Sequence, residues 1–580
     1  METPSDEKKT MGEPLLITAP TTSKGGFRTL PFILANEAFE RMASLGLSPN
    51  MILYLTKEYG LETAQAANLI FVWSAANNFT PIIGAFLADS CVGKYRMIGF
   101  GSILSFLGMV LLWLTAMLPQ ARPHCDQFSS ICESPTTTQL LLLYSSFGLM
   151  SIGAGGIRSS SLAFGADQLK RNNPETLQSF FSWYYASISF SALIAVTFIV
   201  YVQDNLGWKM GFGVPVMLMF MSSLSFYLAS PFYVKLKARR SLFTGLAQVI
   251  VASFRNRHID LPSQPTKEVY YHGKGSMLHV PSEKLRFLNK ACLIKNPQQD
   301  LTSDGNASNP WSLCTIDQAE ELKALIRVTP IWSTGIMLSV IIAQGSFLVI
   351  QAGTMDRHIT PKFEIPAGSF GMFMIIAVIA WIAFYDRIAR PLASKIKGKP
   401  VSLSLKQKMG IGLLCSCASM VSVANVEYIR RETAIQGLSD EPQAMVYISA
   451  LWLLPFNVLG GLAEAFTAIG HMEFFYSELP KTMSSIAANL LGLEAFAASL
   501  VASFITSTVD DVTKKGGESW ISSNINKGHY DYYYWLLAGL CMLNFMYFLA
   551  CSKAYGPCQG DDEGQAQASR KDDRESIDDC

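Results

Sequence analysis

Hydrophobic positions along this chain gather in long blocks that are separated by short polar loops. Many of the blocks reach or exceed 20 residues, which is about the length that a helix needs to cross a bilayer. We therefore predict twelve membrane-spanning helices. They lie at about 29–55, 63–88, 96–119, 138–164, 178–203, 209–234, 324–352, 368–390, 407–429, 443–470, 484–509 and 531–551.

The predicted spans form two groups of six, and a long hydrophilic segment at 236–323 separates them. The ends of this segment, LKARRSLFTGLAQVIVASFRNR and TIDQAEELKALI, have the pattern of amphipathic helices, which favours a position along the membrane surface. The fold class is thus an all-α integral membrane protein with six-helix halves at 29–235 and 324–556. The polar ends, 1–28 and 557–580, are predicted to be disordered tails.

Composition agrees with a membrane protein. Half of the 580 residues are hydrophobic and 16% are charged, against about 25% charged in soluble domains, and the mean hydropathy is +0.25. A net charge of +1 gives no sign of a nucleic-acid partner. No CxxC pair or metal-ligand spacing occurs, and no nucleophile–base set indicates an enzyme. Cys125 and Cys132 flank a short polar loop, and whether they form a disulfide is left open.

The orientation follows from lysines and arginines in short loops, which concentrate on the cytoplasmic side. The loop 387–408 contains seven of them and no acid, whereas the loop 430–442 balances two arginines against three acids. The loop 387–408 is therefore predicted to be cytoplasmic. With twelve spans, both termini and the 236–323 segment lie on the same side.

The first predicted span contains three charged residues, Glu37, Glu40 and Arg41. Helical spacings of three and four place their side chains on one face. Ionisable groups at hydrocarbon depth are costly unless they face a polar interior and find partners, and they mark ion pathways or proton relays. We predict a proton-coupling cluster here, with a static structural network as the alternative.

Single charged residues also occur in later spans. Arg158 lies in the fourth span and Glu464 in the tenth, so a bridge between them would join the two halves and close one side of a cavity. Protonation of Glu464 would weaken that bridge. Since arginine stays protonated, the acids must carry the titration. Glu37 and Glu40 compete for Arg41, and one of them is expected to bind the proton.

Sequence motifs extend this picture by resemblance. The loop from Gly84 to Arg96 resembles the signature loop of the major facilitator superfamily. The ExxER motif of the first span, the GAGGIRSSSLAFGADQ stretch with FFSWYY at 180–185, and Glu464 resemble the proton-dependent oligopeptide transporter family. The long central segment and strings such as RFLNKACL are similar to its plant nitrate/peptide branch, most of all to the first subfamily, which includes low-affinity nitrate carriers.

This resemblance implies a proton-coupled symporter that works by alternating access, with the proton as coupling ion and no other cofactor. It implies that Arg158 and Glu464 form an inner gate. It also implies that Asp356 takes part in an outer gate with Arg41 or another basic residue. The expected partners are protons, the lipid bilayer and a small-molecule substrate, and the expected location is the plasma membrane rather than the vacuolar membrane.

Nitrate at low affinity is the first expected substrate, held by Arg158 and polar groups such as Gln344. Two departures weaken this expectation. Ile342 stands where dual-affinity nitrate carriers of the family place a histidine, and Met97 stands where they place their switching threonine.

Other residues leave the substrate open. Glu494 in the eleventh span either faces the cavity, where it disfavours a bare anion, or packs against a neighbouring helix. Trp183 and Tyr184 belong to an aromatic set that could line a pocket for a larger organic anion, or could be packing residues. His471 could join a proton path or simply end a helix. The alternatives to nitrate are an organic anion such as a hormone, a di- or tripeptide, and a transporter-like sensor without bulk flux.

Overall fold

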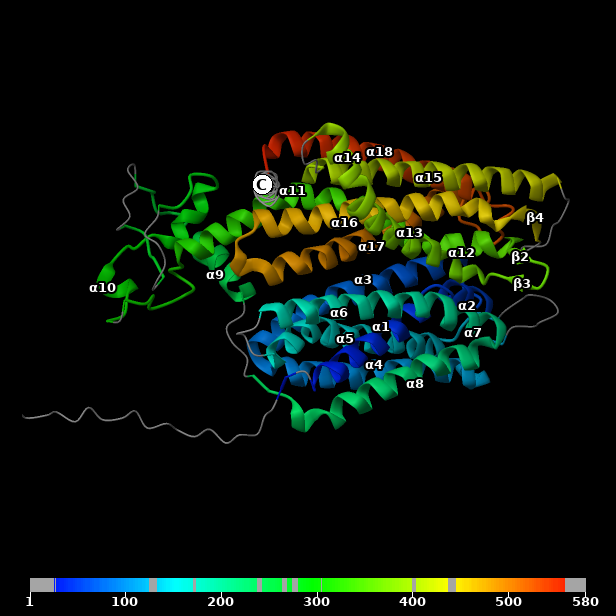
Figure 1. The fold of residues 1–580 in the computed structure, drawn as a ribbon, viewed down its shortest axis with the longest axis horizontal. Coiled ribbons are helices and arrows are strands. Elements are labelled where there is room, and N and C mark those ends of the chain that lie inside the picture. Colours follow the sequence, from blue (N-terminus) through cyan, green and yellow to red (C-terminus); the bar gives the residue numbers. More distant parts are fainter. Residues whose placement is uncertain are drawn as a thin grey trace, which may run out of the picture.

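The computed structural model describes residues 25–26, 28–124, 133–169, 174–236, 242–262, 269–273, 280–303, 305–398, 403–436 and 445–558. Cys125 and Cys132, and the predicted terminal tails beyond residues 25 and 558, lie outside these ranges. The described helices form two bundles side by side, with the central segment at one end of the molecule (Figure 1). This end is called the central-segment end below, and the opposite one the far end.

The N-terminal half comes first in the chain and forms the blue-to-cyan bundle of Figure 1. Its helices are α1 (Leu30–Leu47), α2 (Met51–Lys57), α3 (Thr63–Leu87), α4 (Lys94–Met117), α5 (Thr137–Gln168), α6 (Pro174–Ile194), α7 (Val200–Asn205) and α8 (Gly207–Leu228). The first span was predicted as one helix, 29–55, but it is divided into α1 and α2. A turn at residues 48–50 separates them, and Pro49 within this turn has no N–H to donate to the preceding turn of α1.

The C-terminal half forms the green-to-red bundle. Its helices are α11 (Ile316–Ala343), α12 (Gly345–Gly353), α13 (Gly371–Phe384), α14 (Arg390–Lys397), α15 (Leu405–Gln436), α16 (Leu454–Glu478), α17 (Ser484–Lys514) and α18 (Tyr530–Tyr555). Short strands lie at its far end: β1 (Met355–Asp356) pairs with β4 (Val446–Ser449), and β2 (His358–Thr360) with β3 (Phe363–Glu364).

Eleven helices of the described chain are long and apolar enough to cross a membrane. The first predicted span is not among them. Its main helix, α1, spans 18 residues and contains Glu37, Glu40 and Arg41. With α1 counted as the remaining member, the helices form the two six-span halves of a major facilitator fold, as predicted.

The central segment contains folded elements of its own: α9 (Leu242–Arg255), a 3-10 helix at Arg286–Cys292 and α10 (Pro297–Asp300). One face of α9, with Val249 and Ala252 fully buried, packs against the 3-10 helix and the beginning of α11. The predicted helical end TIDQAEELKALI becomes the first three turns of α11 instead of a separate surface helix. A Thr315–Gln318 capping box starts α11 there, eight residues before the predicted span.

Glycines bring α3, α4 and α5 into close contact inside the N-terminal half. A Cβ on Gly84 would lie 2.6 Å from the carbonyl oxygen of Gly155, and one on Gly101 would lie 2.7 Å from that of Gly153. Side chains larger than hydrogen do not fit at these positions, and such contacts are typical of tightly packed membrane helices. This glycine seam, defined by Gly84, Gly101, Gly153 and Gly155, fixes the position of α5 and therefore of Arg158.

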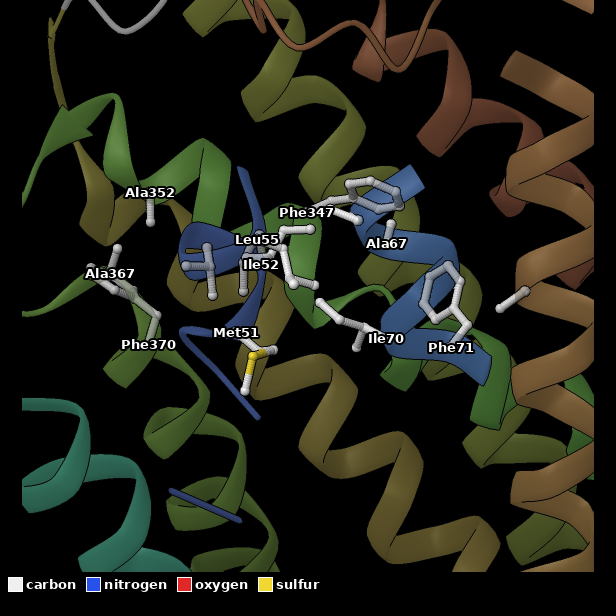
Figure 2. Close-up of a cluster of buried hydrophobic side chains, with 14 of the residues drawn as sticks. Met51, Ile52, Leu55, Ala67, Ile70, Phe71, Phe347, Ala352, Ala367 and Phe370 are labelled. Carbon is white, nitrogen blue, oxygen red and sulfur yellow. The ribbon is translucent and has the colours of Figure 1, made fainter. Parts of the chain in front are cut away.

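The two halves meet toward the far end. Figure 2 shows the apolar contact, in which Met51, Leu55 and Phe71 of α2 and α3 lie close to Phe347 and Phe370 of the C-terminal half. Hydrogen bonds along α3 and α17 continue this contact. They join Asn68 with Ser507 and Ser74 with Ser499, at 2.9 and 3.2 Å. The far-end seam, as we call these contacts, closes that side of the molecule.

Candidate functional site

The candidate site is a cluster of four charged side chains in the N-terminal half. Arg158 on α5 reaches Glu40 on α1, with Nη2 donating to Oε1 at 2.9 Å and Nε donating to Oε2 at 3.3 Å. Ser44, one turn further along α1, donates to the same Oε1 at 2.6 Å. Glu40 is fully buried, whereas the side chain of Arg158 is 15% exposed. Two parallel bonds of this kind fix both the position and the orientation of the carboxylate.

Arg41 joins the second acid of α1 to the cluster. Its Nε donates to Oε1 of Glu37 at 3.0 Å and lies 4.0 Å from Oε2 of Glu40. The prediction that these three side chains lie together is therefore confirmed by the geometry. With two acids and two arginines, the cluster has no net charge, and a single added proton would leave it with an unbalanced positive charge.

The buried oxygen of Glu37 has an incomplete set of partners. Its Oε2 has no hydrogen bond among the described residues. The side chain of Tyr184, a buried residue of α6, lies beside this carboxylate. A buried carboxylate oxygen without a donor is costly, so Glu37 is the less fully satisfied of the two acids.

The predicted bridge between Arg158 and Glu464 is not formed in this structure. Arg158 pairs with Glu40 of its own half, and no ion pair of Glu464 appears among the described residues. The prediction overlooked that α1 and α5 are neighbours in one half and place Glu40 within reach of the guanidinium. Glu464, on α16 of the other half, is a half-buried acid without a cationic partner there.

Glu494 lies between helices instead of in an open cavity. It is 4% exposed, and its Oε2 lies 3.1 Å from Nδ1 of His471 on α16. Of the two alternatives for Glu494, the structure has the packed one. His471 is also buried within its helix rather than at a free helix end.

Two predicted substrate contacts are placed differently from the expectation. The side chain of Gln344 is buried, donates to Val340 at 2.9 Å and accepts from Tyr533 at 3.0 Å, so its amide is engaged within the C-terminal half. Trp183 is 67% exposed and lies outside the charged cluster, unlike its neighbour Tyr184.

Asp356 does not approach Arg41. It is exposed at the far end, where hydrogen bonds from His358 hold the pKa of its carboxyl below the usual range. The neighbouring residue Arg357 makes the contact between the halves, at 3.8 Å from Asp204 of α7 and 2.6 Å from Glu364. Asp356 thus contacts His358 instead of Arg41, and the ion pair between the halves at this place is made by Arg357.

Several ion pairs have no counterpart in the predictions, and two of them show what the sequence could have indicated. Lys94 pairs with Asp167 at 2.6 Å and joins the loop between α3 and α4 to the end of α5. Both residues lie in the quoted motifs, so this pairing could have been proposed from sequence. Glu427 and Arg430 of α15 form a fully buried pair at 2.8 Å. Their spacing of three residues was a signal that could have indicated it.

The described residues contain no group of three or more His, Cys, Asp or Glu side chains that could hold a metal ion. What the cluster does contain is a set of ion pairs between carboxylate and guanidinium groups. Protonation of an acid in such a cluster would remove its attraction for the neighbouring arginine, so the arrangement links the charge of the acid to the position of the guanidinium.

Comparison with known proteins decides the family. The POT family profile matches residues 95–522 of the chain. The chain belongs to the POT family. It is 55% identical to Protein NRT1/PTR FAMILY 1.2 of Arabidopsis thaliana over 570 residues, which cover 96% of this chain and 94% of the relative. Protein NRT1/PTR FAMILY 1.1 of the same plant is 54% identical and covers 96% of both chains.

Solved structures of POT family transporters share this fold. An auto-inhibited POT family peptide transporter superimposes with a TM-score of 0.67 at 19% identity, covering 91% of this chain and 97% of the other. A POT family transporter in complex with 5-aminolevulinic acid superimposes with a TM-score of 0.62 at 14% identity, covering 92% and 99%. As a POT family member, the protein is a multi-pass membrane transporter, and its family is not one of enzymes.

Proposed function

We propose that the protein is a proton-coupled symporter and that it carries nitrate at low affinity by alternating access. The observation that supports this proposal most strongly is the buried Glu40–Arg158 pair beside Glu37 and Arg41. Protonation of an acid in the cluster removes one attraction on an arginine. The freed guanidinium then becomes available to an anion or to Glu464 in the opposite half.

The contacts between the halves indicate which state of the proposed cycle this structure represents. The far-end seam is closed in this structure, and the positive loop at 387–408 favours a cytoplasmic position for the central-segment end. These features support an inward-facing state, from which substrate and proton leave. Opening of the far-end seam would then begin the uptake half of the cycle.

Charge balance limits the coupling of nitrate uptake. One nitrate moving with one proton transfers no net charge, so the membrane potential contributes nothing to uptake. A second proton gives the complex one positive charge, for which the potential provides about 2.3 kcal/mol per 100 mV. We therefore propose more than one proton per nitrate, and an inward current is the direct readout.

The experiment is a voltage-clamp recording in oocytes at pH 5.5 and pH 7.5, with and without nitrate. We expect an inward current that requires nitrate and is larger at pH 5.5. If neither current nor tracer nitrate uptake rises above that of uninjected oocytes, nitrate symport is wrong. The Glu40→Gln variant then separates a transporter from a sensor, because only a protein with flux has flux to lose.

A larger organic anion is the second candidate. It is favoured by Ile342, a half-exposed aliphatic residue where nitrate carriers of the family have a protonatable side chain, and by the engagement of Gln344 with Tyr533. Neither residue offers a small anion a free polar group. A panel of organic anions tested by uptake at pH 5.5 would identify such a substrate, with the Glu40→Gln variant as the negative control.

A further inference from the structure

The C-terminal half contains a buried pair of ionisable side chains that has no role in the transport cycle proposed above. His471 of α16 and Glu494 of α17 are 1% and 4% exposed, and Nδ1 of the histidine lies 3.1 Å from Oε2 of the glutamate. An ionised carboxylate can only accept hydrogen bonds. The hydrogen on the histidine therefore belongs on Nδ1 when the glutamate is charged, and Nε2 remains free to accept a proton.

A third helix closes over this pair. Ser339 of α11 donates to Oε1 of Glu494 at 3.3 Å. One turn earlier, Gly335 faces both groups so closely that a Cβ there would overlap the histidine ring and the carboxylate. The glycine is thus required for α11 to lie against the pair. Trp332 fastens the same face of α11 by donating to the backbone carbonyl of Leu490 on α17 at 2.9 Å.

Few other charges are near enough to balance the pair. On α16, Glu464 precedes His471 by two helical turns and Glu473 pairs with Lys408 of α15. On α11, the nearest charged residue is Arg327, two turns before Gly335, and α17 has no other charged residue before Asp510. The imidazole also contacts an aromatic ring, that of Phe475, whose centre lies 5.4 Å away. The two side chains therefore depend on each other.

We propose that His471 and Glu494 form a second proton-binding site, in the half of the protein opposite the Glu37–Glu40–Arg41 cluster. The proton adds to Nε2 of His471 and converts a neutral imidazole beside a carboxylate into an imidazolium–carboxylate pair. The net charge of the buried pair changes from −1 to zero. Release is the reverse step, in which the proton returns to water and the buried negative charge is restored.

This change in charge gives the site a mechanical effect. A buried net charge is costly in low dielectric, whereas a hydrogen-bonded pair of opposite charges is much less so. Proton binding therefore favours the packing of α11 against α16 and α17, and proton loss favours a state that admits water between these helices. The pair acts on transport by positioning α11, and it does not have to touch the substrate.

The site also supplies the second proton that electrogenic anion uptake needs. One proton at the N-terminal cluster and one at the His471–Glu494 pair would accompany a monovalent anion with a net charge of +1. This part of the inference rests on the proposed function. Proton binding by the pair itself does not, and it can be measured without any substrate.

The experiment counts protons taken up by the purified protein in detergent when the pH of a weakly buffered solution is lowered from 8 to 5. This range includes the pH at which an ordinary histidine side chain changes its charge. We expect the double variant His471→Gln/Glu494→Gln to take up about one proton per molecule fewer than the unmodified protein. The Ser146→Ala variant changes a buried serine of the other half, which donates to the carbonyl of Leu143 in its own helix, and it keeps both ionisable groups. It is the control and should take up the full number.

An unchanged proton count in a double variant that elutes as a single folded species would overturn the proposal. If the double variant does not fold, Glu494→Gln alone serves, because it removes the carboxylate that balances the charge of a protonated His471, and the count should fall by the same amount. If the unmodified protein gives no nitrate current but the double variant still takes up one proton fewer, only the proposed substrate is refuted. If the unmodified protein gives the nitrate current but the double variant takes up as many protons as the unmodified protein, the second site is refuted.

Discussion

Glu40 is the residue on which the N-terminal cluster depends, because it accepts hydrogen bonds from Nε and Nη2 of Arg158 and from the hydroxyl of Ser44. We expect Glu40→Gln to reduce proton-driven uptake into proteoliposomes by at least about tenfold, which corresponds to about 1.4 kcal/mol. Counterflow, in which labelled and unlabelled substrate exchange without net proton movement, should persist, because the neutral side chain resembles the protonated acid.

The matched control for this variant is Glu283→Gln, which changes an exposed glutamate of the central segment. Both uptake and counterflow should stay within about twofold of the unmodified protein, as is usual for a surface substitution. Loss of counterflow together with uptake in Glu40→Gln would contradict a role in proton coupling and indicate a structural role instead.

The charged residues could be found from sequence, but their partners could not. Spacing on one helix places Glu37, Glu40 and Arg41 on one face, and this much is local geometry. Arg158 has acids available in both halves, and which one it contacts depends on how the halves are oriented. The same sequence adopts every conformation of the transport cycle, so the ion pairs of one conformation cannot be predicted from it.

At the scale of the element, α15 offers a test of buried charge. Arg430 is fully buried, donates twice to Glu427 at 2.8 Å, and also bonds Asn526 and the carbonyl of Ile525. Replacing it by methionine leaves Glu427 without a cation, and we expect a loss of about 3–5 kcal/mol in the free energy of unfolding. Thermal unfolding followed by size-exclusion chromatography in detergent would measure this as a lower midpoint temperature.

The double variant Glu427→Leu/Arg430→Met is the informative companion to that experiment. It removes both charges, so it should recover most of the lost stability. If the double variant is no more stable than Arg430→Met, the loss comes from the missing contacts to Asn526 and Ile525 rather than from a stranded carboxylate.

The central segment makes a second prediction at this scale. Cys292 and Cys314 are buried where the segment, including its helix α9, packs against α11. Burial raises the pKa of the Cys314 thiol to about 12. Burial also raises the pKa of the Cys292 thiol. Because only the thiolate reacts, maleimide at pH 7–9 should label the exposed Cys91 and leave these two unmodified until the protein is unfolded.

This labelling is best read by peptide mass spectrometry in a background in which Cys125, Cys132 and Cys580 are replaced by serine. Modification of Cys292 in the native protein, at a rate comparable to that of Cys91, would mean that the segment opens readily and does not form a stable unit with α11.

The sequence predicted the positions of most membrane helices well, because apolar length is a property of each helix alone. It was less informative where tertiary contacts decide. The extension of α11 back to Ile316 is an example, since this amphipathic end could have lain on the membrane. Its apolar face is instead covered by Val249 and Ala252 of α9, an arrangement that only the folded chain specifies.

For the whole molecule, alternating access requires the far-end seam to open. The hydroxyl oxygens of Ser74 and Ser499 lie 3.2 Å apart, so cysteines at these positions would have the approach that a disulfide needs. We expect the oxidised Ser74→Cys/Ser499→Cys variant to lose at least about 90% of uptake, and dithiothreitol to restore it. Each single cysteine variant is a control and should be unaffected by oxidation. Uptake that continues in the cross-linked protein would contradict opening at this seam.

The glycine seam between α3, α4 and α5 has a consequence for any attempt to watch that opening. Because glycines bring the backbones of these helices into direct contact at the crossing points, the helices have little freedom to slide past one another. The three helices should therefore move as one rigid body. A pair of spectroscopic labels on α4 and α5 would then serve as a length standard inside the moving molecule. Any widening recorded between α3 and α17 can be read against it without an external reference.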